Sequence, residues 1–382
     1  MTFVSSVIAA RAPLVAFTVM GVMWGSMAAD LPDLKAMLGV DEAQLGLLMF
    51  PTPVAAVVAM FFAPLFARIT GRSALFAATL MMALAFALPG QTANVWIYPI
   101  AMMACGASTG LTDVLMNARV AAIEAARGRS LMNLCHAAYS FGYAGGAIGT
   151  GVMRAAGWPP SSVLATVAGL AALASLLAYE RDGSVTGLDR PKERGAARLG
   201  LVPIIGGAMI FIAFLTENAS ENWSALYIEK TLGGSPAHGA MGPAVMAMTM
   251  GVARLFGQGF ASRFAPERLL MAAAMISAGG LVVASSAQGP GTAYAGFIIA
   301  GIGASVISPT AFSLVGAHSA PQARARAIAR ATMIGYLGYF VGPPAFGFFA
   351  GSIGLRATFV IAAGLLASIL ILAPMMARRG AR

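Results

Sequence analysis

The sequence carries very little charge for its length. Of its 382 residues, 10% are charged and 59% are hydrophobic, whereas a soluble domain usually carries about 25% charged residues. One core could not hide this much apolar surface from water, so the composition excludes a soluble fold. A membrane-spanning helix needs about 20 apolar residues, and short loops would leave room for roughly a dozen such helices.

The sequence is also poor in the residues and motifs of enzyme sites. It has two cysteines, Cys105 and Cys135, both in apolar runs, which argues against a disulfide framework or a zinc site. The three histidines are widely separated, and there is no P-loop, GxSxG or HExxH motif. We therefore expect neither an enzyme nor a cofactor, and we expect an ion gradient to supply any energy.

Apolar runs bounded by polar residues predict an all-α membrane protein with twelve transmembrane helices. Helix ends are placed to within a few residues only. The predicted spans are Pro13–Ala29, Gln44–Ala67, Ser73–Leu88, Val95–Val120, Leu131–Met153 and Ser161–Tyr179, then six that begin near Leu201, His238, Leu269, Ala293, Ala327 and Ala357. The charge-rich stretch Arg181–Arg198 lies between the two sets.

The basic residues alternate in a way that predicts the orientation. If the N-terminus is cytoplasmic, 19 of the 24 Lys and Arg residues fall in cytoplasmic segments and Arg254 falls inside a span. The four on the opposite side are Lys35, Arg154, Lys230 and Arg356. A cytoplasmic excess of Lys and Arg is the usual signature of topology. The net charge of +10 is therefore attributed to topology rather than to nucleic-acid binding.

The two sets of helices share an internal repeat. Gly106–Ser108 recurs as Gly303–Ser305, and Gly142-Tyr143 recurs as Gly338-Tyr339, at nearly the same shift of 197 and 196 residues. Glycine is common in membrane helices, so the near-constant shift is the informative feature. Two six-helix halves fit the repeats of secondary transporters.

With two sets of six helices, a basic linker and glycine-rich fifth and eleventh helices, the chain resembles the major facilitator superfamily over its whole length. The resemblance implies a major-facilitator fold with an N-terminal six-helix bundle (residues 1–180), a cytoplasmic linker (181–200) and a C-terminal six-helix bundle (201–382). The family's loop after the second helix carries Asp-Arg before Gly-Arg. Here Arg68 and Ile69 replace that Asp-Arg pair, while Gly71-Arg72 is kept.

Two segments resemble the fucose-permease-like bacterial carriers of this superfamily. The first is Asp113–Asn117 on the fourth helix, followed by Glu124 and His136. The second is Glu217–Tyr227 on the seventh helix. The pattern Gly338–Pro343 lies on the eleventh helix, whereas many drug/proton antiporters carry such a pattern on the fifth, which leans away from drug export.

Asp113, Asn117 and His136 are predicted to form one polar cluster. Asp113 and Asn117 are four residues apart and share a helix face, and His136 lies about one to two turns into the neighbouring fifth helix. A charge inside a span is costly and by default marks function. Burial favours the neutral form of a carboxyl group, so Asp113 is a candidate proton carrier, with His136. The alternative is that Asp113 anchors its helix and His136 is a packing residue.

The seventh helix carries an unusual density of polar residues. Glu217, Ser220, Glu221 and Ser224 recur at spacings of three and four, with Trp223 nearby. Such a stripe cannot face lipid, and the family places its substrate cavity between helices 1, 4, 7 and 10. We therefore expect Glu217 and Glu221 to face the cavity, with Glu217 also a candidate for proton coupling. The alternative is that this helix ends near Glu217.

Arg254 inside the eighth helix needs a partner because a guanidinium keeps its charge. Asp113, Glu217 or an anionic substrate would serve, and a purely structural role is the other interpretation. Trp24 and Asp30 on the first helix and Ser305 on the tenth complete the polar candidates. The residues expected to bind substrate are Trp24, Asp30, Asp113, Asn117, His136, Tyr139, Glu217, Ser220, Glu221, Trp223, Arg254 and Ser305.

These features predict a proton-coupled carrier that takes up a small polar solute, sugar-like or another metabolite, by alternating access. It is expected to lie in a bacterial inner membrane as a monomer, with both termini cytoplasmic and with the solute, protons and lipid as its partners. Two alternatives remain open. One is a proton-driven exporter of metabolites or drugs, for which the 24 methionines offer an adaptable interior. The other is a membrane receptor that does not transport.

Overall fold

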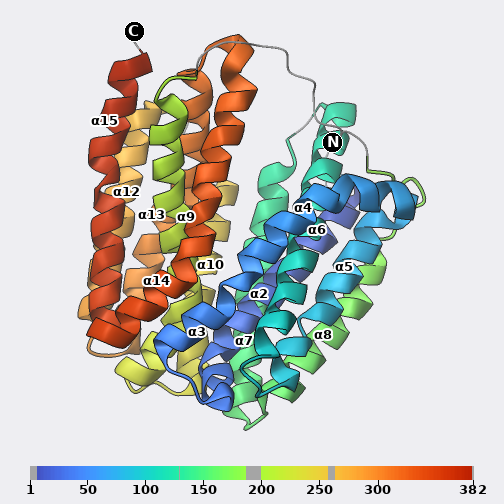
Figure 1. The fold of residues 1–382 in the computed structure, drawn as a ribbon, viewed down its shortest axis with the longest axis vertical. Coiled ribbons are helices and arrows are strands. Elements are labelled where there is room, and N and C mark those ends of the chain that lie inside the picture. The colour runs from blue at the N-terminus through green and yellow to red at the C-terminus, as the bar shows by residue number, and fades with distance from the viewer. Residues whose placement is uncertain (1–6, 129, 186–198, 257–262, 381–382) are drawn as a thin grey trace.

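The computed structural model describes residues 7–128, 130–185, 199–256 and 263–380, and every regular element within these ranges is helical. The first set of helices is α2 (Arg11–Leu38), α3 (Glu42–Met49), α4 (Pro51–Thr70), α5 (Ala74–Ala85), α6 (Tyr98–Arg127), α7 (Met132–Ala155) and α8 (Pro160–Ser175). The second is α9 (Val202–Leu226), α10 (Pro236–Phe256), α12 (Pro266–Ser286), α13 (Pro290–Ala317), α14 (Arg324–Ala367) and α15 (Ile369–Gly380). The two sets stand side by side (Figure 1).

Among the described residues, nine segments are long and apolar enough to cross a membrane. Two of them, Glu42–Gln91 and Arg324–Met376, have 50 and 53 residues, about twice the length of one span. The chain reverses inside each, at Gly71 with φ 56° and at Gly354 with φ 84°, values that favour glycine. Dividing these two segments gives eleven helices, and the predicted count of twelve requires α7, which is not among the nine, as a further span.

The first and fifth predicted helices are longer than expected. The prediction ended the first near Ala29, but α2 continues to Leu38 and stops at Gly39, which is left-handed with φ 66°. Likewise α7 continues past Met153 to Ala155. Both extensions carry charged residues that form ion pairs, described below, so the drop in hydropathy does not mark a helix end.

The repeated glycines perform the same packing role in both halves. A Cβ atom on Gly142 of α7 would collide with the carbonyl oxygen of Thr18 in α2. In the second half, a Cβ on Gly338 of α14 would collide with the carbonyl oxygen of Phe211 in α9. Small residues of this kind let membrane helices approach closely. The sequence repeat therefore corresponds to a repeated helix pair, α2 with α7 and α9 with α14.

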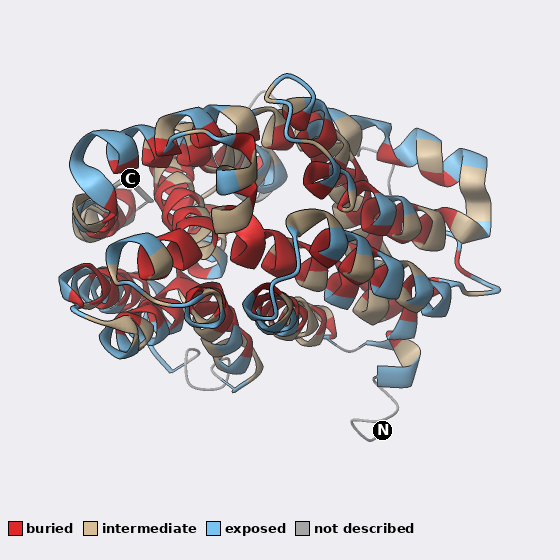
Figure 2. Cartoon of the chain, turned by 90° about the horizontal axis from the view of Figure 1, so that it is seen from below, coloured by how far each residue is buried: buried red, intermediate tan, exposed pale blue. Residues whose placement is uncertain are grey.

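Large apolar side chains face outward from the bundle. Leu170, Leu173, Val282, Phe348 and Ile371 are all about half exposed or more. Figure 2 shows exposed residues around the periphery and buried residues toward the middle. In water such a surface would be unstable, whereas lipid solvates it. The linker predicted at 181–200 lies mostly outside the described residues, at 186–198, so the boundary between the halves stays a prediction.

Both ends of the chain lie at the same end of the helices (Figure 1), which we call the terminal end; the other is the distal end. At the distal end, small residues bring the two halves together. Ala28, Ala29, Tyr143, Ala144 and Ala147 of α2 and α7 form one buried cluster with three alanines of α10, Ala240, Ala244 and Ala247. At this cluster the halves therefore meet mainly through the methyl groups of alanine.

Candidate functional site

A cavity of about 560 Å³ lies between the two halves, within the usual size range of small-molecule sites. The first half lines it from α2, α3, α4, α6 and α7, and the second half from α9, α10, α13 and α14. Nine of the twelve residues predicted to bind substrate line it: Trp24, Asp113, Asn117, His136, Tyr139, Glu217, Glu221, Arg254 and Ser305. Residues distant in sequence thus converge on one space.

On the first-half wall, Asp113 accepts a hydrogen bond from Nδ2 of Asn117 at 3.0 Å, and the same nitrogen donates to the Asp113 carbonyl oxygen at 2.9 Å. His136 lies instead edge-on against Phe17, with ring centroids 5.0 Å apart. No hydrogen bond joins His136 to Asp113 within the described part of the chain. Glu124, from the same family-like segment, accepts from the backbone N–H of Met132 at 2.8 Å and so holds the start of α7.

On the second-half wall, Arg254 of α10 forms an ion pair with Glu217 of α9 at 3.4 Å. Its other terminal nitrogen donates to Oγ of Ser140 in α7 at 3.2 Å. Arg254 therefore contacts both halves, and Glu217 is the partner that the sequence left undecided. Glu221, one turn further along α9, also lines the cavity, but its carboxylate takes part in no ion pair or hydrogen bond with the described residues.

Aromatic rings form much of the remaining wall. Tyr139 and Tyr143 of α7 lie 6.0 Å apart between ring centroids. Across the cavity, Phe214 of α9 stacks on Tyr339 of α14 at 4.7 Å and meets Tyr336 at 5.8 Å. All five residues line the cavity. A rigid aromatic wall with a few carboxylates is suited to a small solute with a flat apolar face and polar edges.

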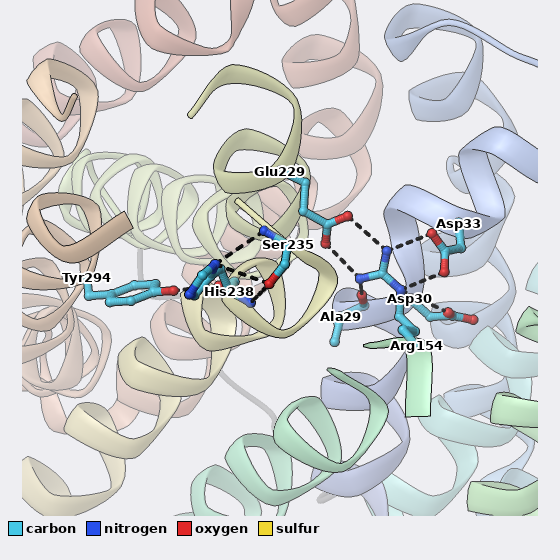
Figure 3. A network of polar contacts seen from close by, with 8 residues as sticks. All are labelled: Ala29, Asp30, Asp33, Arg154, Glu229, Ser235, His238 and Tyr294. Carbon is cyan, nitrogen blue, oxygen red and sulfur yellow. Dashed lines mark hydrogen bonds and ion pairs between the residues drawn. The ribbon is translucent and has the colours of Figure 1, made fainter. Parts of the chain in front are cut away.

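Beyond the cavity, at the distal end, one arginine joins the halves (Figure 3). Arg154 of α7 is buried and donates two hydrogen bonds to Asp33 of α2, at 2.8 and 2.7 Å. It donates two more to Glu229 of the second half, at 2.7 and 2.9 Å, and one to the carbonyl oxygen of Ala29 at 2.6 Å. These bonds use all five N–H groups of the guanidinium. We call this set the distal network.

A second group of charges lies beside the distal network. Glu42, the first residue of α3, forms an ion pair with Lys230 from the π-helical turn Tyr227–Thr231 after α9. Lys35 of α2 lies 3.6 Å from the same carboxylate. Lys230 and Glu42 thus make another contact between the two halves at the same end. Close by, Oγ of Ser235 lies 3.1 Å from Nδ1 of His238 at the start of α10.

Three predicted substrate residues lie outside the cavity lining. Asp30 is fully buried 3.6 Å from Nε of Arg154, and neither of its oxygens has a hydrogen-bond partner in the described chain. Ser220 is buried and donates to the carbonyl oxygen of Thr216 within α9. Trp223 is fully buried against Phe346 of α14. Of the predicted stripe, Glu217 and Glu221 line the cavity, whereas Ser220 and the neighbouring Trp223 do not.

The sequence prediction missed the role of Arg154 because it placed this residue in a loop after the fifth helix. One signal was available. The distal ends of the first and seventh predicted helices carry the acids Asp30, Asp33 and Glu229, and Arg154 follows the fifth helix on the same side. Acids gathered at one end of a bundle require a cation, since like charges in a low dielectric repel strongly.

Comparison with known proteins identifies the family. A family model described as the Major Facilitator Superfamily matches residues 14–284 and residues 207–381. The chain belongs to the Major Facilitator Superfamily. An uncharacterized transporter of this superfamily from Yersinia pestis is 31% identical over 364 residues, which cover 93% of this chain and 92% of that protein. The chain is thus a multi-pass membrane transporter and not an enzyme.

Solved structures of this superfamily share the fold. A bacterial homologue of the human lysosomal transporter Spinster, in an inward-facing and occupied conformation, matches with a TM-score of 0.75 at 15% identity, covering 96% of both chains. The transporter FucP in an outward conformation matches with a TM-score of 0.58 at 16% identity, covering 96% of this chain and 99% of that one. The predicted major-facilitator fold and the resemblance to fucose-permease-like carriers are confirmed.

Proposed function

We propose that this superfamily member is a proton-coupled secondary transporter that moves a small polar solute by alternating access. The observation that carries the proposal is the position of the cavity. Both halves line it, and Arg154, Glu229, Glu42 and Lys230 join the halves on its distal side. Rocking of one half against the other about a central site is how such folds move a solute. The distal contacts are the ones that rocking has to break.

The basic residues support a cytoplasmic position for the terminal end. In that orientation the distal network closes the outer side, and we infer that the cavity is reached from the inside. The fold comparison points the same way, because the inward-facing neighbour superposes with a higher TM-score than the outward-facing one. We infer a resting conformation that faces the cytoplasm, with both termini there.

Proton coupling is assigned to Asp113. This carboxyl group lines the cavity, and within the described ranges its hydrogen-bond partner is the Asn117 amide. It has no cationic partner among the described residues, so uptake and release of a proton would change its interactions without breaking an ion pair. Glu217, by contrast, is paired with Arg254, and His136 packs on Phe17. Asp113 is therefore the proton carrier we favour among the three predicted candidates.

The test uses the purified chain in liposomes with a pH-sensitive dye inside. Addition of a transported solute should acidify the lumen when the transporter moves solute and proton together. Asp113→Asn should abolish the acidification and leave solute exchange in place, while Asn117→Ala should keep acidification. A solute that crosses without any pH change, or coupling that Asp113→Asn leaves intact, would contradict the proposal.

A further inference from the structure

The charges that line the cavity do not balance. Three carboxylates, those of Asp113, Glu217 and Glu221, face one guanidinium, that of Arg254. Arg254 is already paired with Glu217 at 3.4 Å. If Asp113 carries the coupled proton, as proposed above, Glu221 remains as the carboxylate that forms no ion pair or hydrogen bond with the described residues, and the nearby Arg254 is already held by Glu217. Because an isolated carboxylate away from water is strongly unfavourable, a solute with a positive charge is the natural complement of Glu221.

The surroundings of Glu221 fit a cation as well. Tyr139 and Tyr143 of α7 and Tyr339 of α14 line the same cavity as Glu221. A cation next to tyrosine faces gains from the negative charge of the ring faces. A carboxylate with tyrosines on both walls therefore favours an ammonium group over a neutral or anionic one.

The lining also holds uncharged polar side chains from both halves. Asn117 and Asn133 belong to the first half, and Asn218 belongs to the second. A few polar groups in a mostly apolar pocket fix the orientation of a bound solute. Their presence on both walls indicates a solute that has hydrogen-bonding groups of its own.

We propose that the solute is a small hydroxylated amine, carried in its protonated form. Its ammonium group binds the carboxylate of Glu221, and its hydroxyl groups meet the amide side chains of Asn117, Asn133 and Asn218 in the lining. A hexose-sized amine fits a cavity of about 560 Å³ with room to spare. This inference rests on the transport function proposed above and names the substrate class of that cavity.

The test compares ligands that share a ring and differ in charge. Binding of glucosamine, galactosamine, glucose, galactose, N-acetylglucosamine and glucuronate to the purified chain is measured by calorimetry and by thermal stabilisation. At least one amine should bind ten times more tightly than its neutral counterpart, and glucuronate should not bind. Binding of a neutral sugar or of glucuronate in preference to both amines overturns the inference. No amine binding at millimolar concentration also overturns it.

Two variants test whether the amine binds at the carboxylate of Glu221. Glu221→Gln should weaken binding of the amine about tenfold or more and should leave any residual binding of the neutral sugar unchanged. Glu267→Gln makes the same change on α12, where Glu267 lies 3.8 Å from His318 outside the cavity, and should change nothing. An equal loss for amine and sugar in Glu221→Gln would mean a structural role for Glu221 and would overturn the assignment.

Transport measurements separate this inference from the function on which it rests. If liposomes accumulate a neutral sugar with protons and ignore the amines, the transport proposal stands and the substrate class is wrong. If an amine binds at Glu221 but never crosses the membrane, the binding site stands and the transport proposal is wrong.

Discussion

Arg154 and Glu229 face each other across the boundary between the two halves and share two hydrogen bonds, of 2.7 and 2.9 Å (Figure 3). Arg154 belongs to α7 of the first half, and Glu229 follows α9 of the second. Asp33 holds the other edge of the same guanidinium. The arginine is therefore fixed to its own half and offers its free edge to the other, which is the arrangement expected of a contact that opens and closes.

Glu229→Gln should open the distal end more often. Removing one partner of a buried ion pair destabilises the protein by roughly 3–5 kcal/mol. Here the loss affects only the conformation in which the distal end is closed, because the pair forms only there. To measure opening, Ala147→Cys introduces a thiol at a position that is fully buried in the alanine cluster. The rate at which a membrane-impermeant maleimide labels this thiol is then measured. Cys105 and Cys135 are replaced beforehand. We expect labelling of the introduced thiol to be at least ten times faster in Glu229→Gln.

The control for this variant is Glu180→Gln. Glu180 pairs with Arg119 at 2.8 Å, but both residues belong to the first half, so no contact between halves is lost. Labelling of the introduced thiol should stay at the rate of the parent. Equal rates in the Glu229 and Glu180 variants would show that Arg154 holds its own half together and has no part in closing the distal end.

Lys230→Ala should have a much smaller effect than Glu229→Gln. The Lys230 side chain is 55% exposed, and exposed ion pairs contribute about 1 kcal/mol or less. Glu42 also keeps Lys35 at 3.6 Å as a second partner. Labelling of the thiol in Ala147→Cys should therefore rise about fivefold at most. An effect as large as that of Glu229→Gln would contradict the prediction that the Lys230–Glu42 pair contributes less to distal closure than the Arg154–Glu229 pair.

A methyl group on Gly347 should also disturb distal closure. A Cβ atom there would collide with the carbonyl oxygen of Glu42, so α14 and α3 pack backbone to backbone at this point. Overpacking costs typically 1–3 kcal/mol, and the clash disappears once the halves part. Gly347→Ala should therefore speed labelling of the same introduced thiol. Gly364→Ala is the matched control, because a Cβ at Gly364 meets nothing within 4 Å.

The helices and the polar clusters could be predicted from the sequence because hydropathy and spacing carry that information. The contacts between the halves could not. Four basic residues were predicted on the side opposite the cytoplasm: Lys35, Arg154, Lys230 and Arg356. In the structure each of them interacts with another group of the protein. The first three form ion pairs, and Arg356 donates to the carbonyl oxygen of Ser285 at 2.9 Å.

Helical spacing alone does not say which stripe of a helix faces a cavity. Glu221 and Ser220 are neighbours on α9, yet Glu221 lines the cavity and Ser220 bonds back to its own helix. Trp223 packs on α14 through Phe346. The choice depends on the position of α14, a partner more than a hundred residues away in sequence. Such long-range packing leaves no periodic trace in a single sequence.

Arg254 and Glu217 should behave as one unit in stability. Arg254→Ala leaves Glu217 without its cation, and Glu217→Gln takes from Arg254 its ion-pair partner and leaves its hydrogen bond to Ser140. The double variant removes both charges, so it should be less impaired than the sum of the two. Neighbours of this kind show interaction energies of about 0.5–3 kcal/mol. Thermal unfolding of the four proteins measures this coupling, and strictly additive effects would rule out an energetically important pair.

Asp113→Asn should separate solute movement from proton movement. The introduced amide can still accept the hydrogen bond that Asn117 donates at 3.0 Å, so the packing of α6 is retained and only the titratable group is lost. Exchange of labelled for unlabelled solute across liposomes needs no net proton flow and should continue within about threefold of the parent. Accumulation driven by a pH gradient does need net proton flow and should vanish.

The control is Asn117→Ala, which removes the amide but keeps the carboxyl group and should retain accumulation, although at a lower rate. If Asp113→Asn abolished exchange and accumulation alike, the carboxylate would be part of solute binding, and the proton would have to be carried by another group in the cavity.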